Sequence, residues 1–308
     1  MNVIFLGTPK FAVAVLDAIL ASSHKVAAVV TQPDRVNARG GKIIFSPVKV
    51  LALEQGLPVL QFENISKEGA DILRALGADI MVTAAYGQIL SQQVLDICKH
   101  GVINCHASIL PKYRGASPVQ AALLNGDRET GVSIMQTVQA VDAGDVILIE
   151  KLTLSGEENA EECLAALSHL GGRAVVKALG AIADGSVVFS PQDQAQATFS
   201  KKLKKEDGKL NFNKNAEELN NIVRAFAPKP SAYLSSPHGA LKVLRAAVIQ
   251  GDFSGQNGEV LNSDKNGFII KCAKGVLSLL EVQGEGGKVM PFDAYLRGRP
   301  IAKGTVLV

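Results

Sequence analysis

Short runs of apolar residues alternate with longer stretches of helical character through the first two-thirds of the chain. Strand-like runs occupy residues 3–7, 26–31, 80–84 and 102–106, and helix-like stretches such as 67–76 separate them. Buried strands that alternate with helices are typical of parallel sheets covered on both faces. We therefore predict an α/β domain with a Rossmann-like, doubly wound, mostly parallel sheet.

The pattern changes after a long predicted helix that ends near residue 183. A segment with Gly, Ser and Pro follows, and beyond it a helix at 216–226 precedes short strands separated by Gly, Asn and Asp turns. This second pattern predicts a smaller, OB-like β-barrel. We expect a first domain over residues 1–189, a linker over 190–206 and a C-terminal β-barrel domain over 207–308.

The two parts also differ in charge. Residues 1–199 carry a formal net charge of −4 and residues 200–308 one of +7. A basic module suits a polyanionic partner, although a solvated lysine-rich surface has the same composition. The four cysteines have no paired spacing, so we expect a cytoplasmic protein without disulfides or a metal. No apolar run approaches the ~20 residues of a membrane span, and no membrane partner is expected.

The glycine pattern disfavours a nucleotide cofactor. Gly7 follows the first strand, but the sequence there, GTPKFA, lacks the further glycines of a dinucleotide-binding loop. No phosphate-binding loop ending in Gly-Lys-Ser or Gly-Lys-Thr occurs in the chain. Fold class alone therefore names no function.

The stretch INCHASILPKYRGASPVQ at 103–120 carries the strongest indication of chemistry. Asn104 and His106 lie two residues apart at the carboxyl end of a predicted strand, so their side chains share one side of the sheet. Cys105 lies between them and is expected to pack in the core on the opposite side. Asp142, in the turn Val-Asp-Ala-Gly-Asp, is a candidate carboxylate, although a turn-forming role alone would also explain it.

These motifs resemble the 10-formyltetrahydrofolate-dependent formyltransferases. Further segments extend the resemblance along the whole chain, among them FLGTPKFA at 5–12, AAYGQIL at 84–90, SKKLKKEDGKLNF at 200–212 and VRAFAPKPSAY at 223–233. The last two are similar to the members that act on tRNA. The resemblance implies a transferase that passes the formyl group of 10-formyltetrahydrofolate to the α-amino group of methionyl initiator tRNA, for translation initiation. It also implies a catalytic first domain and a tRNA-binding barrel.

The expected reaction gives each candidate residue a role. Asn104 would donate a hydrogen bond to the developing oxyanion, His106 would be a second donor when cationic, and Asp142 would support that cation. The resemblance implies a folate site and charge clustering indicates a tRNA site. The folate residues are Gln88, Ile89, Leu90, Ser108, Ile109, Leu110, Pro111 and Val141, and the tRNA residues are Arg35, Arg39, Lys42, Lys201, Lys202, Lys204 and Lys205.

Three other functions fit parts of the pattern. The same catalytic set would serve a formyltransferase for a small amine, such as a glycinamide nucleotide or an amino-sugar nucleotide, or a hydrolase of the formyl folate. The +7 charge of residues 200–308 disfavours both. A non-enzymatic tRNA-binding protein is disfavoured because all three catalytic residues are present. We expect a monomer.

Overall fold

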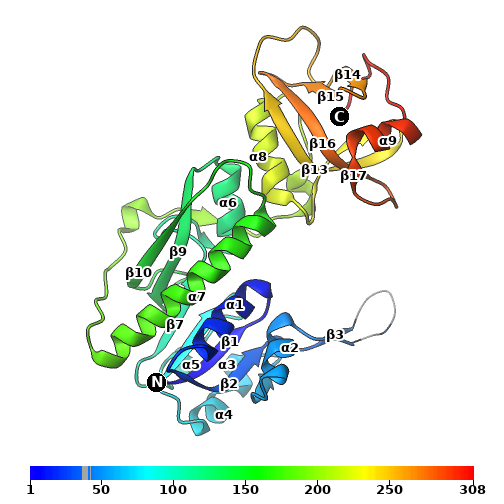
Figure 1. Cartoon of the computed structure of the whole chain (residues 1–308). Helices are drawn as coiled ribbons and strands as arrows, with labels where there is room; N and C mark the ends of the chain where they lie inside the picture. The colour runs from blue at the N-terminus through cyan, green and yellow to red at the C-terminus, as the bar shows by residue number, and fades with distance from the viewer. Residues whose placement is uncertain (37–40, 42) are drawn as a thin grey trace. The chain divides into compact units, whose positions relative to one another are not determined.

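A computed structural model describes residues 1–36, 41 and 43–308 of the chain (Figure 1). It divides into two compact units. The first comprises Met1–Pro118, Glu129–Leu152 and Leu164–Ser200, and the second comprises Val119–Arg128, Thr153–Cys163 and Lys201–Val308. No helix in the described part of the chain combines the length and the apolar composition that crossing a bilayer requires.

A seven-stranded sheet forms the first unit, with the strand order β10-β9-β7-β6-β1-β2-β5. The strands from β7 to β5 in this order pair in parallel, whereas β9 runs antiparallel to β7. Their bounds are β1 Asn2–Gly7, β2 Lys25–Thr31, β5 Val59–Gln61, β6 Ile80–Ala84, β7 Val102–His106, β9 Glu129–Gln136 and β10 Val146–Thr153. The predicted doubly wound, mostly parallel sheet is confirmed.

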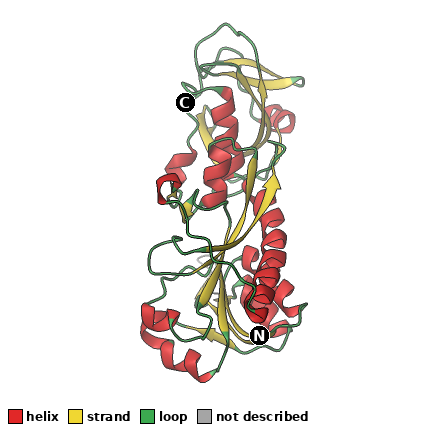
Figure 2. Cartoon of the chain, turned by 90° about the vertical axis from the view of Figure 1, so that its left-hand side faces the viewer, coloured by secondary structure: helices red, strands yellow, loops and turns green. Residues whose placement is uncertain are grey.

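Helices cover both faces of this sheet (Figure 2). On one face, Ile4 and Leu6 of β1 pack in a buried cluster with Ile65 and Leu73. On the other face α7 lies close to the sheet, since a Cβ at Gly171 would lie 2.6 Å from Cys105 Sγ. The helices are α1 Lys10–Leu20, α2 Pro47–Glu54, α3 Ile65–Glu68, α4 Ala70–Ala75, α5 Gln92–Leu95 and α7 Ala160–Asp184.

The stretch 67–76, predicted as a single helix, lies in α3 and α4, which meet at Gly69. A Cβ at Gly69 would lie 2.8 Å from both the carbonyl oxygen and Cγ1 of Ile65, so this joint accepts only glycine. The prediction of one helix was wrong because the helical spacing of apolar residues continues across the break.

Two short strand pairs complete the first unit. β3 (Arg35–Val36) and β4 (Ile43–Ile44) form an antiparallel hairpin. β8 (Arg114–Gly115) pairs in parallel with β11 (Phe199–Ser200), and the turn η1 (Gln194–Gln196) precedes β11. The segment expected as a linker therefore carries regular structure that binds it to β8.

A six-stranded antiparallel sheet forms most of the second unit, in the order β12-β13-β16-β15-β14 with β17 beside β16. Its strands are β12 Ala232–Ser236, β13 Gly239–Ile249, β14 Val260–Asp264, β15 Gly267–Lys271, β16 Val276–Gly284 and β17 Met290–Pro291. The helices of this part are α6 Pro118–Leu124, α8 Ala216–Phe226 and α9 Phe292–Gly298, with the turn η2 Lys205–Gly208.

The last residues of the chain close this sheet into a barrel. Beside β14, the Leu307 N–H donates to the Gly258 carbonyl and the Val260 N–H donates to the Thr305 carbonyl, each at 2.8 Å. On the opposite edge, the Ser235 N–H of β12 donates to the Val308 carbonyl at 2.5 Å. The segment thus supplies partners for two edge strands, which removes the exposed edges of an open sheet.

Candidate active site

Asn104 and Thr83 face each other across the parallel strands β7 and β6. The Thr83 hydroxyl donates to Asn104 Oδ1 at 2.8 Å and also contacts the Ile103 carbonyl at 3.3 Å. Because the Asn104 oxygen already accepts this bond, the orientation of the amide is set and its Nδ2 hydrogens point elsewhere. An amide held in this way is suited to donating to an external oxygen.

His106 is buried at the end of β7, with a side chain only 7% exposed. Its Nε2 lies 3.0 Å from the Tyr113 carbonyl oxygen, which accepts hydrogen bonds only, so Nε2–H is the donor. Its Nδ1 lies 3.6 Å from Asp142 Oδ2. That separation is too long for a hydrogen bond, but it is short enough for attraction between a carboxylate and a cationic imidazole.

Asp142 is held in a left-handed backbone conformation, with φ of 49°. Its Oδ2 accepts the Gly115 N–H at 2.8 Å, and its backbone carbonyl accepts Gln192 Nε2 at 2.9 Å. Two residues later, a Cβ at Gly144 would lie 1.9 Å from the Gln136 carbonyl oxygen, so the turn requires glycine there. The carboxylate is thus fixed beside His106 by contacts from three separate segments.

Cys105 points away from this group, as expected for alternate residues of a strand. It is 3% exposed and lies against Gly171 of α7. Burial raises the pKa of its thiol to about 12. A thiol of this kind is not ionised near neutral pH, and the interpretation of Cys105 as core packing is confirmed.

The predicted folate residues differ in what they expose. The side-chain amide of Gln88 donates to the Phe62 carbonyl and accepts the Ile65 N–H, both at 2.9 Å, so only its backbone is left for a ligand. By contrast, Ile89 is 80% exposed and Val141, next to Asp142, is 58% exposed. Such exposed apolar side chains are suited to covering a flat heterocycle.

The segment 108–111 is held by hydrogen bonds to Lys112 and to Ser133 of β9. Ser108 Oγ donates to the Lys112 carbonyl at 2.6 Å, and the Ser108 carbonyl accepts Ser133 Oγ at 2.7 Å. Ser108, Leu90 and Leu110 are buried, whereas Ile109 and Pro111 are half-buried. Their assignment to a folate site stays a prediction.

The predicted tRNA residues are exposed where the structure describes them. These are Arg35, Lys201, Lys202, Lys204 and Lys205. Arg39 and Lys42 lie outside the described residues. Their assignment to a tRNA site also stays a prediction.

A polar network holds the base of the β3–β4 hairpin. Lys49 Nζ bonds Gln61 Oε1 at 2.8 Å and pairs with Asp34, and Gln61 Nε2 donates to Asp34 Oδ1 at 3.0 Å. Beyond this network the hairpin presents apolar side chains to solvent, with Val36 66% and Ile43 63% exposed. Such a hairpin offers contact area as well as charge.

Sequence reasoning missed four groups that orient the candidate catalytic residues: the Thr83 hydroxyl, the Tyr113 carbonyl, the Gly115 N–H and the Gln192 amide. Residues 113 and 115 lie inside the motif at 103–120, so the sequence could have indicated these two positions through that motif. Gln192 lies 50 residues from Asp142 in the sequence, so no local sequence pattern predicted their contact.

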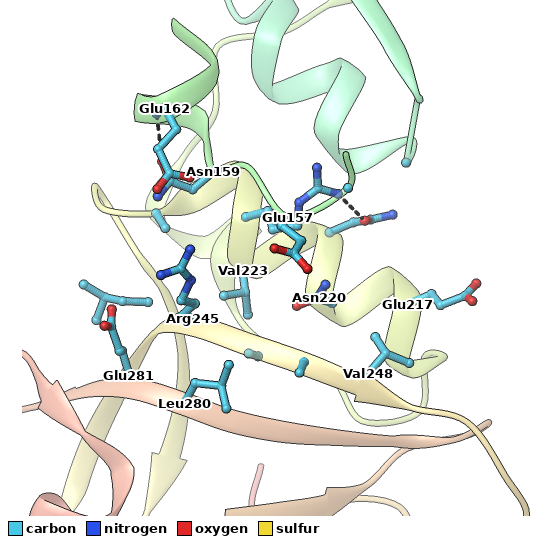
Figure 3. A pocket seen from close by; sticks show the side chains of 18 of the residues that line it. Glu157, Asn159, Glu162, Glu217, Asn220, Val223, Arg245, Val248, Leu280 and Glu281 are labelled. Atoms are coloured by element: carbon cyan, nitrogen blue, oxygen red, sulfur yellow. Dashed lines mark hydrogen bonds between the residues drawn. The ribbon is translucent and has the colours of Figure 1, made fainter. Parts of the chain in front are cut away.

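A separate cavity of about 870 Å³ lies in the second unit, between α8, β13 and the loop that precedes α7 (Figure 3). Its lining mixes both signs of charge. The arginines are Arg128, Arg224 and Arg245, and the carboxylates are Glu157, Glu162, Glu217 and Glu281. Carboxylates on several walls repel phosphate groups. We therefore do not assign this cavity to a nucleic acid.

Comparison with known protein families establishes the class. Residues 1–179 match the family model described as formyl transferase, and residues 202–300 match the model described as formyl transferase, C-terminal domain. The chain therefore belongs to the formyl transferase family, as its motifs predicted.

Individual relatives show which members of the formyl transferase family the chain is similar to. The chain is 43% identical over 310 residues to the methionyl-tRNA formyltransferase of Ectopseudomonas mendocina (strain ymp), covering 100% of this chain and 98% of that protein. Two solved structures share the fold. HypX from Aquifex aeolicus in complex with tetrahydrofolic acid has a TM-score of 0.67 at 14% identity, over 100% of this chain and 50% of that one. The N-formyltransferase from Helicobacter canadensis, in complex with folinic acid and dTDP-3-aminofucose, has a TM-score of 0.64 at 18% identity, over 90% and 98%.

Proposed function

We propose that this formyltransferase transfers the formyl group of 10-formyltetrahydrofolate to the α-amino group of methionyl initiator tRNA, as a cytoplasmic monomer that serves translation initiation. The observation that carries the proposal is the His106–Asp142 pair, with Asn104 two residues before His106 on the same strand, in a formyl transferase chain that also has the C-terminal domain. The name of its 43% identical relative supports tRNA as the acceptor.

The residues present fit a folate co-substrate. Exposed Ile89 and Val141 offer apolar surface for its ring, and the backbone beside Gln88 offers donors and acceptors, because the Gln88 side chain is already bonded. A bound formyl folate supplies a formyl carbon attached to nitrogen. The amine must attack this carbon, so the protein has to stabilise negative charge on the formyl oxygen and move one proton.

Asn104 and His106 are placed for the first of these tasks. The Asn104 amide is a neutral donor oriented by Thr83, and the removal of one such donor from an active site costs about 10²–10³ in rate. His106 Nδ1 is 3.6 Å from the Asp142 carboxylate and is not hydrogen-bonded to it. A proton on Nδ1 is therefore free to be donated to an oxygen placed beside the carboxylate.

Asp142 serves both tasks. Its negative charge beside His106 attracts the imidazolium. Its carboxylate also offers acceptor sites for a water that relays the proton from the attacking amine to the folate nitrogen, which leaves as its bond to the formyl carbon breaks, since the Gly115 N–H occupies only one of these sites. Each role requires the carboxylate to be ionised and fixed in position.

The tRNA is expected to bind through charge and through the β3–β4 hairpin. Lys201, Lys202, Lys204 and Lys205 are exposed and belong to a segment of net charge +7, residues 200–308. Contacts of this kind go to phosphates and contribute affinity without reading sequence. Selection among tRNAs must then come from the acceptor end, which exposed apolar and basic hairpin residues are suited to contact.

The test is formyl transfer with the purified protein and labelled 10-formyltetrahydrofolate. Acceptors are methionyl initiator tRNA, methionyl elongator tRNA, a glycinamide nucleotide, an amino-sugar nucleotide and water. We expect labelled formylmethionyl initiator tRNA, with the other acceptors at least ~10²-fold slower in kcat/KM. Faster transfer to either small amine, or release of formate without an acceptor, would overturn the proposal.

A further inference from the structure

Gln192 joins the two ends of the turn that carries Asp142. It is 9% exposed and lies in the segment after α7, far from the turn in sequence. Its Nε2 donates to the Asp142 carbonyl at 2.9 Å and to the Gly144 carbonyl at 2.7 Å. Both hydrogens of one amide are therefore used to hold residues 142–144.

Arg114 fixes the other end of the Gln192 amide. Gln192 Oε1 accepts from Arg114 Nε at 3.0 Å and from Nη2 at 2.8 Å, and Arg114 Nη1 donates to Gln194 Oε1 at 2.9 Å. Arg114 as a whole is 3% exposed. A flipped amide would place its NH₂ against the guanidinium and its oxygen against two carbonyls, so only one orientation is possible.

Three consecutive residues thus act on the His106–Asp142 pair, two by direct hydrogen bonds and one through Gln192. The Tyr113 carbonyl accepts from His106 Nε2 at 3.0 Å, and the Gly115 N–H donates to Asp142 Oδ2 at 2.8 Å. Arg114, between them, acts on the Asp142 backbone through Gln192. The parallel pairing of β8 with β11 anchors residues 114 and 115. Residues 113–115 therefore restrain both His106 and Asp142.

We propose that Gln192, oriented by Arg114, is a positioning residue that holds the Asp142 carboxylate at its working distance from the His106 imidazole. The inference rests on the proposed function, since only formyl transfer gives that distance a catalytic meaning. Asp142 occupies a backbone region that is costly for residues other than glycine, and such a conformation persists only where neighbouring groups determine it. The Gln192 amide supplies two of those restraints.

The test uses Gln192→Glu, which has nearly the same shape. Its carboxylate keeps the bonds from Arg114 but no longer donates to the Asp142 and Gly144 carbonyls. We expect kcat to fall by at least ~10-fold while KM for both substrates changes by less than ~3-fold, because geometry and not binding is lost. Gln196→Glu is the matched control, since Gln196 is exposed and bonds Asp193, and it should stay within ~2-fold of the parent protein.

A second readout needs no activity. Amide hydrogen exchange measured by NMR follows the Gly115 N–H, which the bond to Asp142 Oδ2 protects from solvent. In Gln192→Glu the exchange rate of this N–H should rise by at least ~10-fold, because the Asp142 carboxylate is no longer held against it. Gln196→Glu should leave it unchanged. If Gln192→Glu does not fold, Arg114→Lys, which loses the paired bonds to Gln192 Oε1, should raise the same exchange rate.

The two proposals fail in different ways. A folded Gln192→Glu variant with an unchanged kcat, or with an unchanged exchange rate at the Gly115 N–H, would overturn the positioning role. A parent protein that formylates none of the acceptors would overturn the proposed function, and the exchange rate would still decide whether Gln192 holds the Asp142 carboxylate in place.

Discussion

The backbone N–H of Gly115 donates to Oδ2 of Asp142 at 2.8 Å. The same carboxylate oxygen faces His106 Nδ1, so this one bond orients the carboxylate of the proposed catalytic pair. Gly115 has φ of 110°, and a Cβ there would lie 2.5 Å from the Ser200 carbonyl oxygen. Residues other than glycine are therefore disfavoured at position 115 by the backbone conformation and, independently, by the steric clash with Ser200.

Gly115→Ala should lower both activity and stability. The added methyl group must push β8 away from β11, and this displaces the N–H that holds Asp142. We expect kcat to fall by at least ~10-fold and the free energy of unfolding to fall by about 1–3 kcal/mol.

Gly56→Ala is the matched control, because Gly56 also has positive φ but its Cβ would meet nothing within 4 Å. It should lose about 1 kcal/mol of stability and no activity. Equal kcat values for the two variants in a formyl-transfer assay would contradict this prediction.

The three side chains proposed to be catalytic should each be needed for turnover. We expect Asn104→Ala, His106→Ala and Asp142→Asn to lower kcat by about 10²-fold or more with little effect on folate binding. Cys105→Ser is the control, since Cys105 faces α7, and it should keep most activity while losing some stability. Steady-state kinetics and folate binding by fluorescence measure both quantities. Near-parental kcat for any of the three would remove that residue from the mechanism.

The lysine cluster should govern tRNA affinity. Replacement of Lys201, Lys202, Lys204 and Lys205 by Ala should raise KM for methionyl-tRNA with little change in kcat, because phosphate contacts are the same in ground and transition states. The log–log salt dependence of binding should flatten by up to ~0.7–0.9 for each lost phosphate contact. The control replaces Lys265, Lys274, Lys288 and Lys303, which are exposed residues of the same unit, and so makes the same change in net charge. If both variants show the same salt slope, local contact by the cluster is refuted.

Because of Glu158, the free energy of unfolding should depend on pH at acidic pH values. Partial burial raises the pKa of this carboxyl, but hydrogen bonds from the Ser155 and Gly156 N–H groups outweigh it and lower the pKa to about 2. A carboxyl whose pKa is lower in the folded protein than in the unfolded chain stabilises the fold at pH values above its unfolded pKa, which is near 4.5. This stabilisation is lost as the pH falls toward 2. Glu158→Gln should therefore cost about 1 kcal/mol at pH 7 and almost nothing near pH 2.

Urea unfolding at pH 7, 4 and 2 measures this difference. The exposed neighbour Glu157→Gln is the control and should lose less than ~0.5 kcal/mol at each pH. A Glu158→Gln deficit that is the same at every pH would show that the loss comes from packing and not from the ionised carboxylate.

The sequence by itself determined the α/β class, the antiparallel second part and the family. These follow from local patterns: continuous apolar strands, helical spacing between them and motifs of contiguous residues. Strand alternation was also enough to place Asn104 and His106 on one side and Cys105 on the other. Such patterns are local because side-chain direction within one element depends only on the backbone of that element.

Only the tertiary structure decided how the site is held together. Asp142 reaches His106 because its own backbone is left-handed and because Gly115 and Gln192 hold it from distant segments. The barrel closes because residues 305–308 bond β12 and the start of β14. These bonds join groups far apart in sequence, and their partners become neighbours only once the sheets have formed. The spacing of residues in the sequence does not predict such bonds, because a glutamine in a linker and a glutamine that holds an active site have the same local sequence pattern.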